Sequence, residues 1–141
     1  MSQKSAVFNL SQTVLENTEY RRVLHTTPQQ QLVVMHIRPE DKGIHAEKHR
    51  GTTQSILIHV GKGKAVIEGK SYTLKAGTLV TIGPDAEHEI FQEGPAPLKL
   101  STIYSPPVHA YAAQKLIQES GGDLEAAARQ FAEMFPELFS S

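Results

Sequence analysis

Residues 43–55 of the 141-residue chain read GIHAEKHRGTTQS and place His45, Glu47 and His49 at alternate positions. Successive side chains of a β-strand point to opposite faces, so a strand here would put these three side chains on one face. A helix would distribute them around its axis. The sequence RGTT at residues 50–53 follows at once and has the composition of a turn. The stretch therefore predicts a strand that carries three possible metal ligands and ends at a turn.

The segments around this stretch predict an all-β domain. From about Tyr20 to Tyr104, turns that contain Gly or Pro separate short runs with strand character, and no helical segment lies between them. Strands at such spacing favour an antiparallel sandwich or barrel. The clearest hairpin is residues 61–74, GKGKAVIEGKSYTL, with its reversal expected at residues 68–70. A closed barrel would have a mostly apolar interior, for which we expect Ile56, Ile58, Val60, Val66 and Leu79.

The composition changes after Pro107, where two Ala-rich helical segments follow. The second segment, LEAAARQFAEMF at residues 124–135, comes directly after Asp123, which can cap a helix. We therefore predict a barrel with N-terminal strands over residues 1–109 and a helical C-terminal extension over residues 110–141. The apolar stripe of the second segment favours packing on the barrel or across a homodimer interface, with a groove on a partner as the alternative.

The bulk composition excludes several classes of protein. The formal net charge is −1 and no cluster of Lys or Arg suits a phosphate backbone, so we expect no nucleic-acid partner. The chain has no cysteine, which excludes disulfides, zinc–thiolate sites and cysteine nucleophiles. The N-terminus lacks the apolar core of a signal peptide, and no segment is apolar enough to span a bilayer. We expect a cytoplasmic protein without a membrane partner.

Three segments of a closed barrel can present polar groups to one point. Glu47 and His49 lie on the first segment, Gln54 begins the next strand, and His88 begins a strand after a later turn. Imidazole and carboxylate ligands suit Fe, Mn, Ni, Co, Cu or Zn, and a glutamine amide oxygen is a weaker neutral ligand. Gln54 could instead hydrogen-bond a bound water molecule. His59 has the opposite strand parity to Gln54, so we expect it to face away from the interior.

These residues resemble the first sequence motif of small single-domain cupins. Glu47, His49, Gln54 and Gly61 stand at the matching positions with the spacing kept. Glu replaces the first histidine of the motif and Gln replaces its acid. The same two replacements occur in a cupin subgroup often labelled mannose-6-phosphate-isomerase-like, which the chain also resembles in the flanks of the barrel.

The second cupin motif is matched at its ends. Gly77 and His88 lie at the expected distance, whereas Gly83 stands at the proline position and Asp85 at the second glycine position. The resemblance covers about residues 15–109. It implies an antiparallel jelly-roll barrel with a divalent metal ion inside, in which the metal ligands would be Glu47, His49, Gln54 and His88.

The resemblance does not settle the reaction, because cupins include isomerases, epimerases, dioxygenases, lyases and binding domains. The leading hypothesis is a metal-dependent enzyme, such as an isomerase, that acts on a small organic or sugar-like substrate inside the barrel. The alternatives are a non-catalytic small-molecule-binding cupin and an iron-dependent dioxygenase.

Glu47 is the candidate catalytic residue because a carboxylate can act as ligand and base in turn. His45 and Tyr104 are candidate substrate contacts. We also expect a homodimer, because an incomplete barrel leaves strand edges that proteins normally cover.

Overall fold

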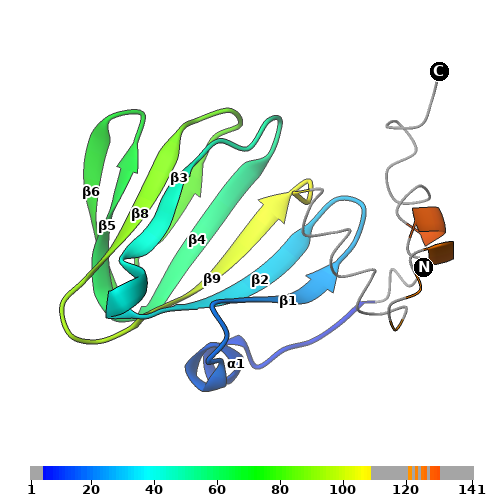
Figure 1. Ribbon diagram of the computed structural model, residues 1–141, viewed down its shortest axis with the longest axis horizontal. Coiled ribbons are helices and arrows are strands. Elements are labelled where there is room, and N and C mark those ends of the chain that lie inside the picture. Colours follow the sequence, from blue (N-terminus) through cyan, green and yellow to red (C-terminus); the bar gives the residue numbers. More distant parts are fainter. Residues whose placement is uncertain (1–4, 109–120, 122, 124, 127, 131–141) are drawn as a thin grey trace.

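A computed structural model of the protein describes residues 5–108 and, nearer the C-terminus, residues 121, 123, 125, 126 and 128–130. Within these residues, nine strands form two antiparallel sheets that face each other (Figure 1). One sheet has the order β1-β2-β9-β4-β7 and the other the order β3-β8-β5-β6. In chain order the strands are β1 (Arg21–Thr26), β2 (Gln31–Ile37), β3 (Gly43–Glu47), β4 (Thr53–Val60), β5 (Lys62–Ile67), β6 (Lys70–Lys75), β7 (Leu79–Ile82), β8 (His88–Glu93) and β9 (Leu98–Ser105). The predicted antiparallel jelly roll is confirmed.

Alternation of buried and partly buried residues builds the core between the sheets. In β4, Gln54, Ile56 and Ile58 are buried and the residues between them are only partly so, as a strand with one face on a core requires. Both sheets contribute to one apolar cluster, which consists of Val33, Met35, Ile37, Ile44, Ile56, Ile58, Ala65, Leu74, Ile82, Ile90, Leu98, Leu100 and Tyr104.

Two residues that the sequence placed inside the barrel face outward instead. Leu79 is 64% exposed, because it pairs with Leu57 on the outer face of its sheet. In β5 the fully buried residue is Ala65, so the next residue, Val66, points to the opposite face. Val60 is only partly buried, since the pairing of β4 with β9 shifts register just before it. Ala65 of β5 and Ile82 of β7 belong to the core instead.

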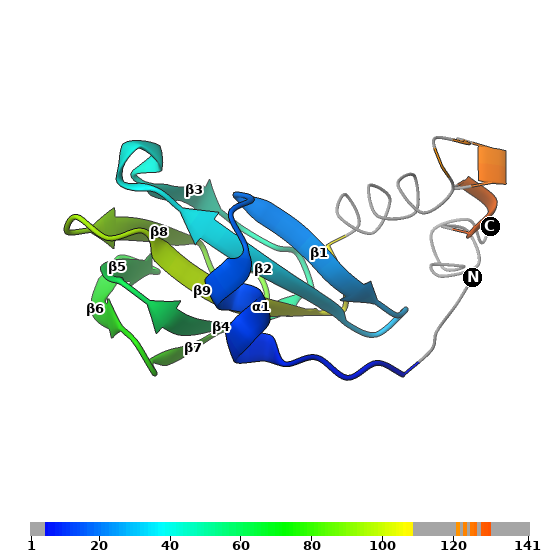
Figure 2. The ribbon, with the colours of Figure 1, turned by 90° about the horizontal axis from the view of Figure 1, so that it is seen from below.

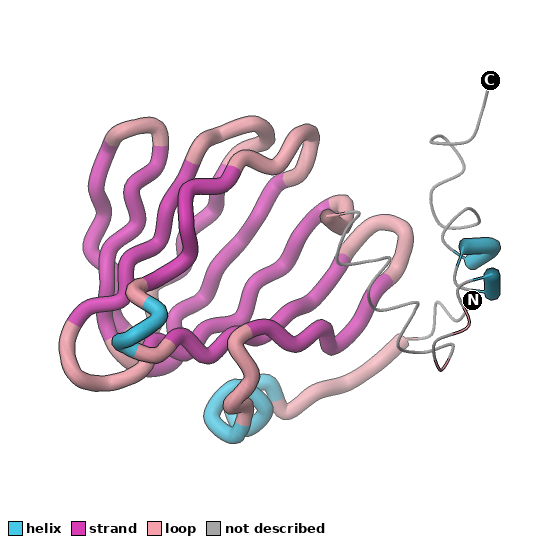
Figure 3. Tube along the Cα trace, viewed as in Figure 1, coloured by secondary structure: helices cyan, strands magenta, loops and turns pink. Residues whose placement is uncertain are grey.

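The predicted hairpin lies where the sequence placed it. Glu68 and Gly69 join β5 to β6, and both have positive φ angles, 48° and 79°. This backbone is typical of a two-residue type I′ turn, which a glycine at the second position favours. Loops and turns connect the strands almost throughout, apart from one 3₁₀ turn, η1 (Pro39–Asp41) (Figure 3).

A short helix before the barrel was not predicted from the sequence. Helix α1 (Leu10–Glu16) begins after Asn9, whose side chain accepts a hydrogen bond from the backbone N–H of Gln12 at 3.2 Å. Val14 is fully buried, and the helix contacts β2, β4 and β9 across the outer face of the five-stranded sheet (Figure 2). The N-terminal part of the chain therefore covers one sheet with a helix before it contributes strand β1.

Part of the predicted C-terminal extension is described. Residues 125, 126 and 128–130 are helical, and Asp123 caps them by accepting a hydrogen bond from the Ala126 N–H at 3.1 Å. The first predicted helical segment, residues 109–120, lies outside the described residues. The division of the chain at residue 109 therefore stays a prediction. Among the helices that are described, none has the length and apolar character needed to cross a membrane.

Candidate metal centre

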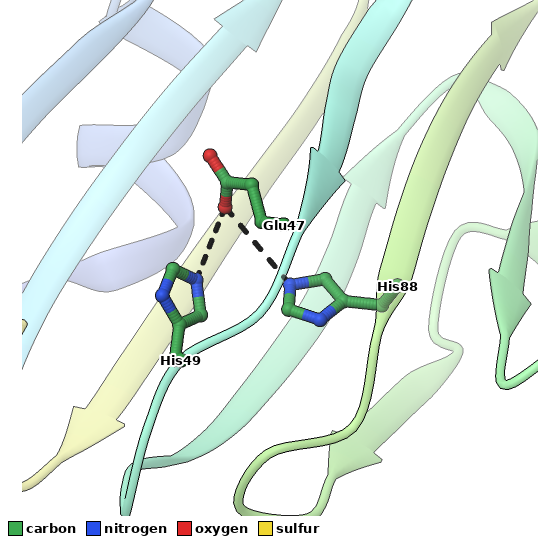
Figure 4. Close-up of side chains that lie close together, drawn as sticks. All are labelled: Glu47, His49 and His88. Atoms are coloured by element: carbon green, nitrogen blue, oxygen red, sulfur yellow. Dashed lines mark hydrogen bonds and ion pairs between the residues drawn. The ribbon is translucent and has the colours of Figure 1, made fainter.

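Glu47, His49 and His88 meet at one end of the barrel interior (Figure 4). Glu47 is the last residue of β3 and pairs with His88, the first residue of β8. His49 lies in the connection from β3 to β4. Its Nε2 is 3.1 Å from Oε2 of Glu47, and the same oxygen is 4.0 Å from Nε2 of His88. Each of the three residues offers a ligand atom within 4.8 Å of the other two. The structure thus brings together three of the four predicted ligands in one cluster.

The alternation that the sequence showed across residues 45–49 does not persist in the structure. The pairing of β3 with β8 shifts register between Ile44 and Glu47. His45 is consequently exposed and lines a separate cavity of about 150 Å³ together with Glu89 and Phe91. The triad depends on this irregularity, which strand parity alone does not foresee.

His88 is held in the orientation and tautomer that metal binding requires. Its Nδ1 lies 3.0 Å from the backbone carbonyl oxygen of Ala86, which can only accept, so Nδ1 carries the proton. The Nε2 of the neutral ring is then a bare acceptor. This atom is buried and has no hydrogen-bond partner among the described residues. A buried acceptor without a partner lowers stability, and a metal ion would supply the missing partner.

Gln54 shows the same pattern on the opposite sheet. Its Nε2 donates to the hydroxyl of Thr102 at 3.0 Å, which turns the amide oxygen the other way. That oxygen is buried, and within the described part of the chain it has no hydrogen-bond partner. The side chain is 2% exposed. Its orientation fits the predicted role as a neutral oxygen ligand and equally a hydrogen bond to a bound water molecule.

Arg21 and the two histidines surround the carboxylate of Glu47. Burial alone would raise the pKa of Glu47, but the hydrogen bond from His49 and the favourable electrostatic interactions with His49, Arg21 and His88 outweigh burial and lower it. The nearest guanidinium nitrogen of Arg21 lies 3.8 Å from Oε1 of Glu47. The carboxylate is therefore ionised at neutral pH, as a metal ligand must be.

Sequence reasoning missed Arg21. Arg21 pairs with Met35, a core residue, so it lies on the strand face that looks into the barrel. An arginine at an inward position beside a carboxylate is the signal that could have found it. That signal depends on the register between β1 and β2, which the sequence did not fix.

Tyr104, a predicted substrate contact, lies beside His49. It is 1% exposed, and its ring centroid lies 5.5 Å from that of His49 with the two rings perpendicular. Tyr104 pairs with Gln54 on one side and with Gln31 on the other.

His59 faces away from the interior, as predicted. It contacts Ser101 at 3.0 Å on the outer face of the five-stranded sheet.

A cleft of about 470 Å³ adjoins the triad and includes His49 in its wall. Its volume falls within the range of small-molecule sites. The residues that line it come from the connection between β3 and β4 and from the segment that follows β9, and they are Lys48, His49, Arg50, Gly51, Thr52, Pro106, Pro107 and Val108.

The triad fits a divalent ion after small side-chain movements. Two ligands that each lie about 2.1 Å from one ion are separated by about 3.0–3.5 Å. The 3.1 Å between His49 and Glu47 already falls in this range. The 4.0 Å between His88 and Glu47 needs to shorten by about half an ångström. The three ligand atoms, which lie within 4.8 Å of one another, approach one ion when their side chains rotate. The buried atoms of His88 and Gln54 that lack a hydrogen-bond partner also support a metal site here.

The chain belongs to the cupin family. Residues 33–104, more than half of the sequence, match the family described as Cupin domain. The uncharacterized protein L612 of Acanthamoeba polyphaga mimivirus is 37% identical over 108 residues, an alignment that spans 73% of this chain. The chain covers 66% of the length of that relative. The family match agrees with the two motifs in the sequence.

Solved structures show the same fold. The crystal structure of BH2720 from Bacillus halodurans has a TM-score of 0.70 at 25% identity, over 74% of this chain and 83% of that one. A cupin protein from Bacteroides fragilis has a TM-score of 0.57 at 23% identity, again over 74% and 83%. KdgF from Halomonas sp. has a TM-score of 0.54 at 17% identity, over 62% and 78%. The last two support the fold alone.

Proposed function

We propose that the protein binds a divalent metal ion through Glu47, His49 and His88, with the amide oxygen of Gln54 as a fourth ligand. One observation carries the proposal. Donor atoms from the end of β3, the following connection and the start of β8 lie within 4.8 Å of one another. The buried Nε2 of His88 needs a partner that the described residues do not provide. The ion would be Fe, Mn, Ni, Co, Cu or Zn, because imidazole and carboxylate ligands suit these metals.

The best-supported activity is that of a metal-dependent enzyme acting on a small organic or sugar-like substrate. When bound, the ion would polarise a carbonyl or hydroxyl group of the substrate or activate a water molecule. Glu47 can move a proton because its carboxylate is ionised at neutral pH. Tyr104 supplies a wall beside His49, and Ile56 adds to the apolar interior. An isomerase is one such enzyme.

Two alternatives each have an observation in their favour. Two histidines and one carboxylate form the ligand set of many iron-dependent oxygenases, which favours an iron-dependent dioxygenase. A non-catalytic small-molecule-binding cupin is favoured by the scarcity of proton-transfer groups. Among the described residues at the triad, Tyr104 is the one such group besides the proposed ligands, because the guanidinium of Arg21 keeps its proton.

We further propose three properties that the sequence predicts. They are membership of the mannose-6-phosphate-isomerase-like subgroup, a cytoplasmic location without nucleic-acid or membrane partners, and a homodimer. The described sheets end in β1 and β7 and in β3 and β6. Unpaired strand edges of this kind favour coverage by a second copy of the chain.

Titration calorimetry with Co²⁺ and Zn²⁺ on chelator-treated protein tests the metal proposal. His49→Ala and His88→Ala should each weaken binding about 100-fold or more, because each removes one of three strong ligands. Glu47→Gln keeps the size of the side chain and removes the anion, so a large loss would assign Glu47 as a ligand. His45→Ala is the matched control, since that histidine is exposed and lines a different cavity.

The proposal fails if His88→Ala binds metal as tightly as the parent protein. A screen of small carbonyl compounds and sugars, followed by nuclear magnetic resonance with the metal-loaded protein, separates the enzyme from the binding cupin. Turnover that Glu47→Gln abolishes favours the enzyme. Binding without turnover across the screen favours the alternative.

A further inference from the structure

The cleft beside the triad has two cationic lining residues and no acidic one. Lys48 and Arg50 both line it, and none of its other lining residues is acidic. Both side chains belong to exposed residues. Within the part of the chain that the structure describes, neither forms an ion pair. The two cations are therefore available to a ligand in the cleft.

The negative charge of Glu47 does not offset these cations. Its Oε2 lies at hydrogen-bond distance from His49, and its Oε1 lies 3.8 Å from Arg21. A divalent ion at the triad would add further positive charge on the same side of the molecule. A cleft lined by one sign of charge concentrates ligands of the opposite sign. This end of the barrel therefore favours an anion.

The rest of the cleft wall indicates what kind of anion fits. Pro106, Pro107 and Val108 contribute an apolar part of the cleft wall. His49 belongs both to the cleft and to the triad, so a ligand in the cleft lies beside the metal position. A carboxylate with a short hydrocarbon body and a second oxygen function matches these three features together.

We propose that the ligand of this site is a small organic acid. Its carboxylate lies against Lys48 and Arg50, its carbon chain lies along Pro106–Val108, and a hydroxyl or carbonyl oxygen faces the metal ion. This inference rests on the proposed function, because the second oxygen needs the ion as its partner. It goes beyond that function by naming the class of substrate.

Matched acids and amides test the proposal on Co²⁺-loaded protein. The probes are 2-, 3- and 4-hydroxybutyrate, each compared with its primary amide in titration calorimetry at low salt. The series varies the distance between hydroxyl and carboxylate, and the amide removes only the charge. We expect one of the acids to bind about tenfold or more tightly than its amide, and we expect this preference to shrink as salt is added, because the cations are exposed.

Two double variants assign the preference to the cleft. Lys48→Gln with Arg50→Gln should reduce the preference for the acid to less than about threefold while the Co²⁺ content stays unchanged. Lys70→Gln with Lys75→Gln removes the same charge from β6, away from the cleft, and should keep the full preference. The two pairs therefore differ in position and not in net charge.

The outcomes separate this inference from the function on which it rests. If the parent protein binds Co²⁺ but none of the acids exceeds its amide by more than about threefold, the organic-acid proposal is overturned and the metal site stands. The same holds if the cleft variant keeps the full preference. If the parent protein does not bind Co²⁺, the metal proposal fails and the organic-acid proposal fails with it.

Discussion

The two halves of the barrel interior differ sharply in polarity although the same strands build both. At one end, the register places Gln31 beside Tyr104 and Tyr104 beside Gln54 across β2, β9 and β4. Glu47 and His88 pair at the same end of the other sheet. We call this end the polar half, and it contains the triad.

The opposite end is aliphatic, and we call it the apolar half. Here the same three strands place Met35 beside Leu100 and Leu100 beside Ile58, and Ile37 lies beside Leu98. All five residues are at most 1% exposed.

This difference indicates that the two ends of each strand have different roles. Burying apolar side chains stabilises the fold, whereas buried polar atoms without partners reduce stability. The apolar half therefore holds the barrel together, and the polar half keeps the atoms that the proposed metal ion would satisfy. Variants in the two halves should affect different measurements.

The largest expected effect is on stability, from a variant in the apolar half. Leu100→Ala removes a fully buried side chain and should lower the free energy of unfolding by about 2–5 kcal/mol in urea denaturation. Leu79→Ala is the matched control, because this leucine is 64% exposed, and should cost less than about 0.5 kcal/mol. Equal losses in the two variants would contradict the assignment of the core.

A smaller effect is expected from Gln54→Ala in the polar half. Removal of a neutral ligand that water can replace should weaken Co²⁺ binding about tenfold in titration calorimetry, which corresponds to about 1.4 kcal/mol. The loss should be well below that of His88→Ala. An unchanged affinity would mean that Gln54 does not contact the ion. A loss as large as that of His88→Ala would show that a neutral amide contributes as much as an imidazole, against our account.

Thr102→Val should have a still smaller effect on metal binding. The hydroxyl of Thr102 accepts the hydrogen bond that orients Gln54, and valine has nearly the same shape without that oxygen. We expect Co²⁺ affinity to fall about threefold, because the amide loses its fixed orientation but remains present. In the background of Gln54→Ala, Thr102→Val should change the affinity no further. An additional loss in the double variant would show that Thr102 acts independently of Gln54.

The smallest effect is expected outside both halves, at His59. Burial lowers the pKa of His59, so the folded protein releases this proton more readily than the unfolded chain does. As pH falls below about 6.5, the unfolded chain binds the additional proton first, and stability decreases. His59→Gln should therefore lose less melting temperature between pH 7.5 and pH 5.5 than the parent protein. A steeper loss in the variant would contradict the sign of this contribution.

Patterns within single strands predicted most of the fold and most of the candidate site. Alternation predicted Ile56 and Ile58 as core residues, and the two motifs named Glu47, His49 and His88, which the structure brings together. These signals are local or have fixed spacing, so the sequence contains them directly.

The features that were missed depend on contacts between distant segments. The outward orientation of Leu79 and the inward orientation of Arg21 depend on the register between strands. The exposed position of His45 depends on an irregularity in the pairing of β3 with β8. The start of helix α1 has a capping signal in the sequence, since Asn9 accepts a hydrogen bond from the Gln12 N–H. The packing of the helix against the sheet is a tertiary contact, which the local sequence does not encode. Register between strands is set by the packing of the whole barrel, which single-strand patterns do not encode.

An anomalous difference map from crystals of Zn²⁺-loaded protein tests the central claim most directly. We predict one strong peak in the polar half, with about 2.0–2.1 Å to Nε2 of His49 and of His88 and about 2.0–2.2 Å to a carboxylate oxygen of Glu47. Crystals of His88→Ala grown under the same conditions should lose the peak. A peak at His45, or a barrel interior without a peak when zinc is bound elsewhere, would contradict the account.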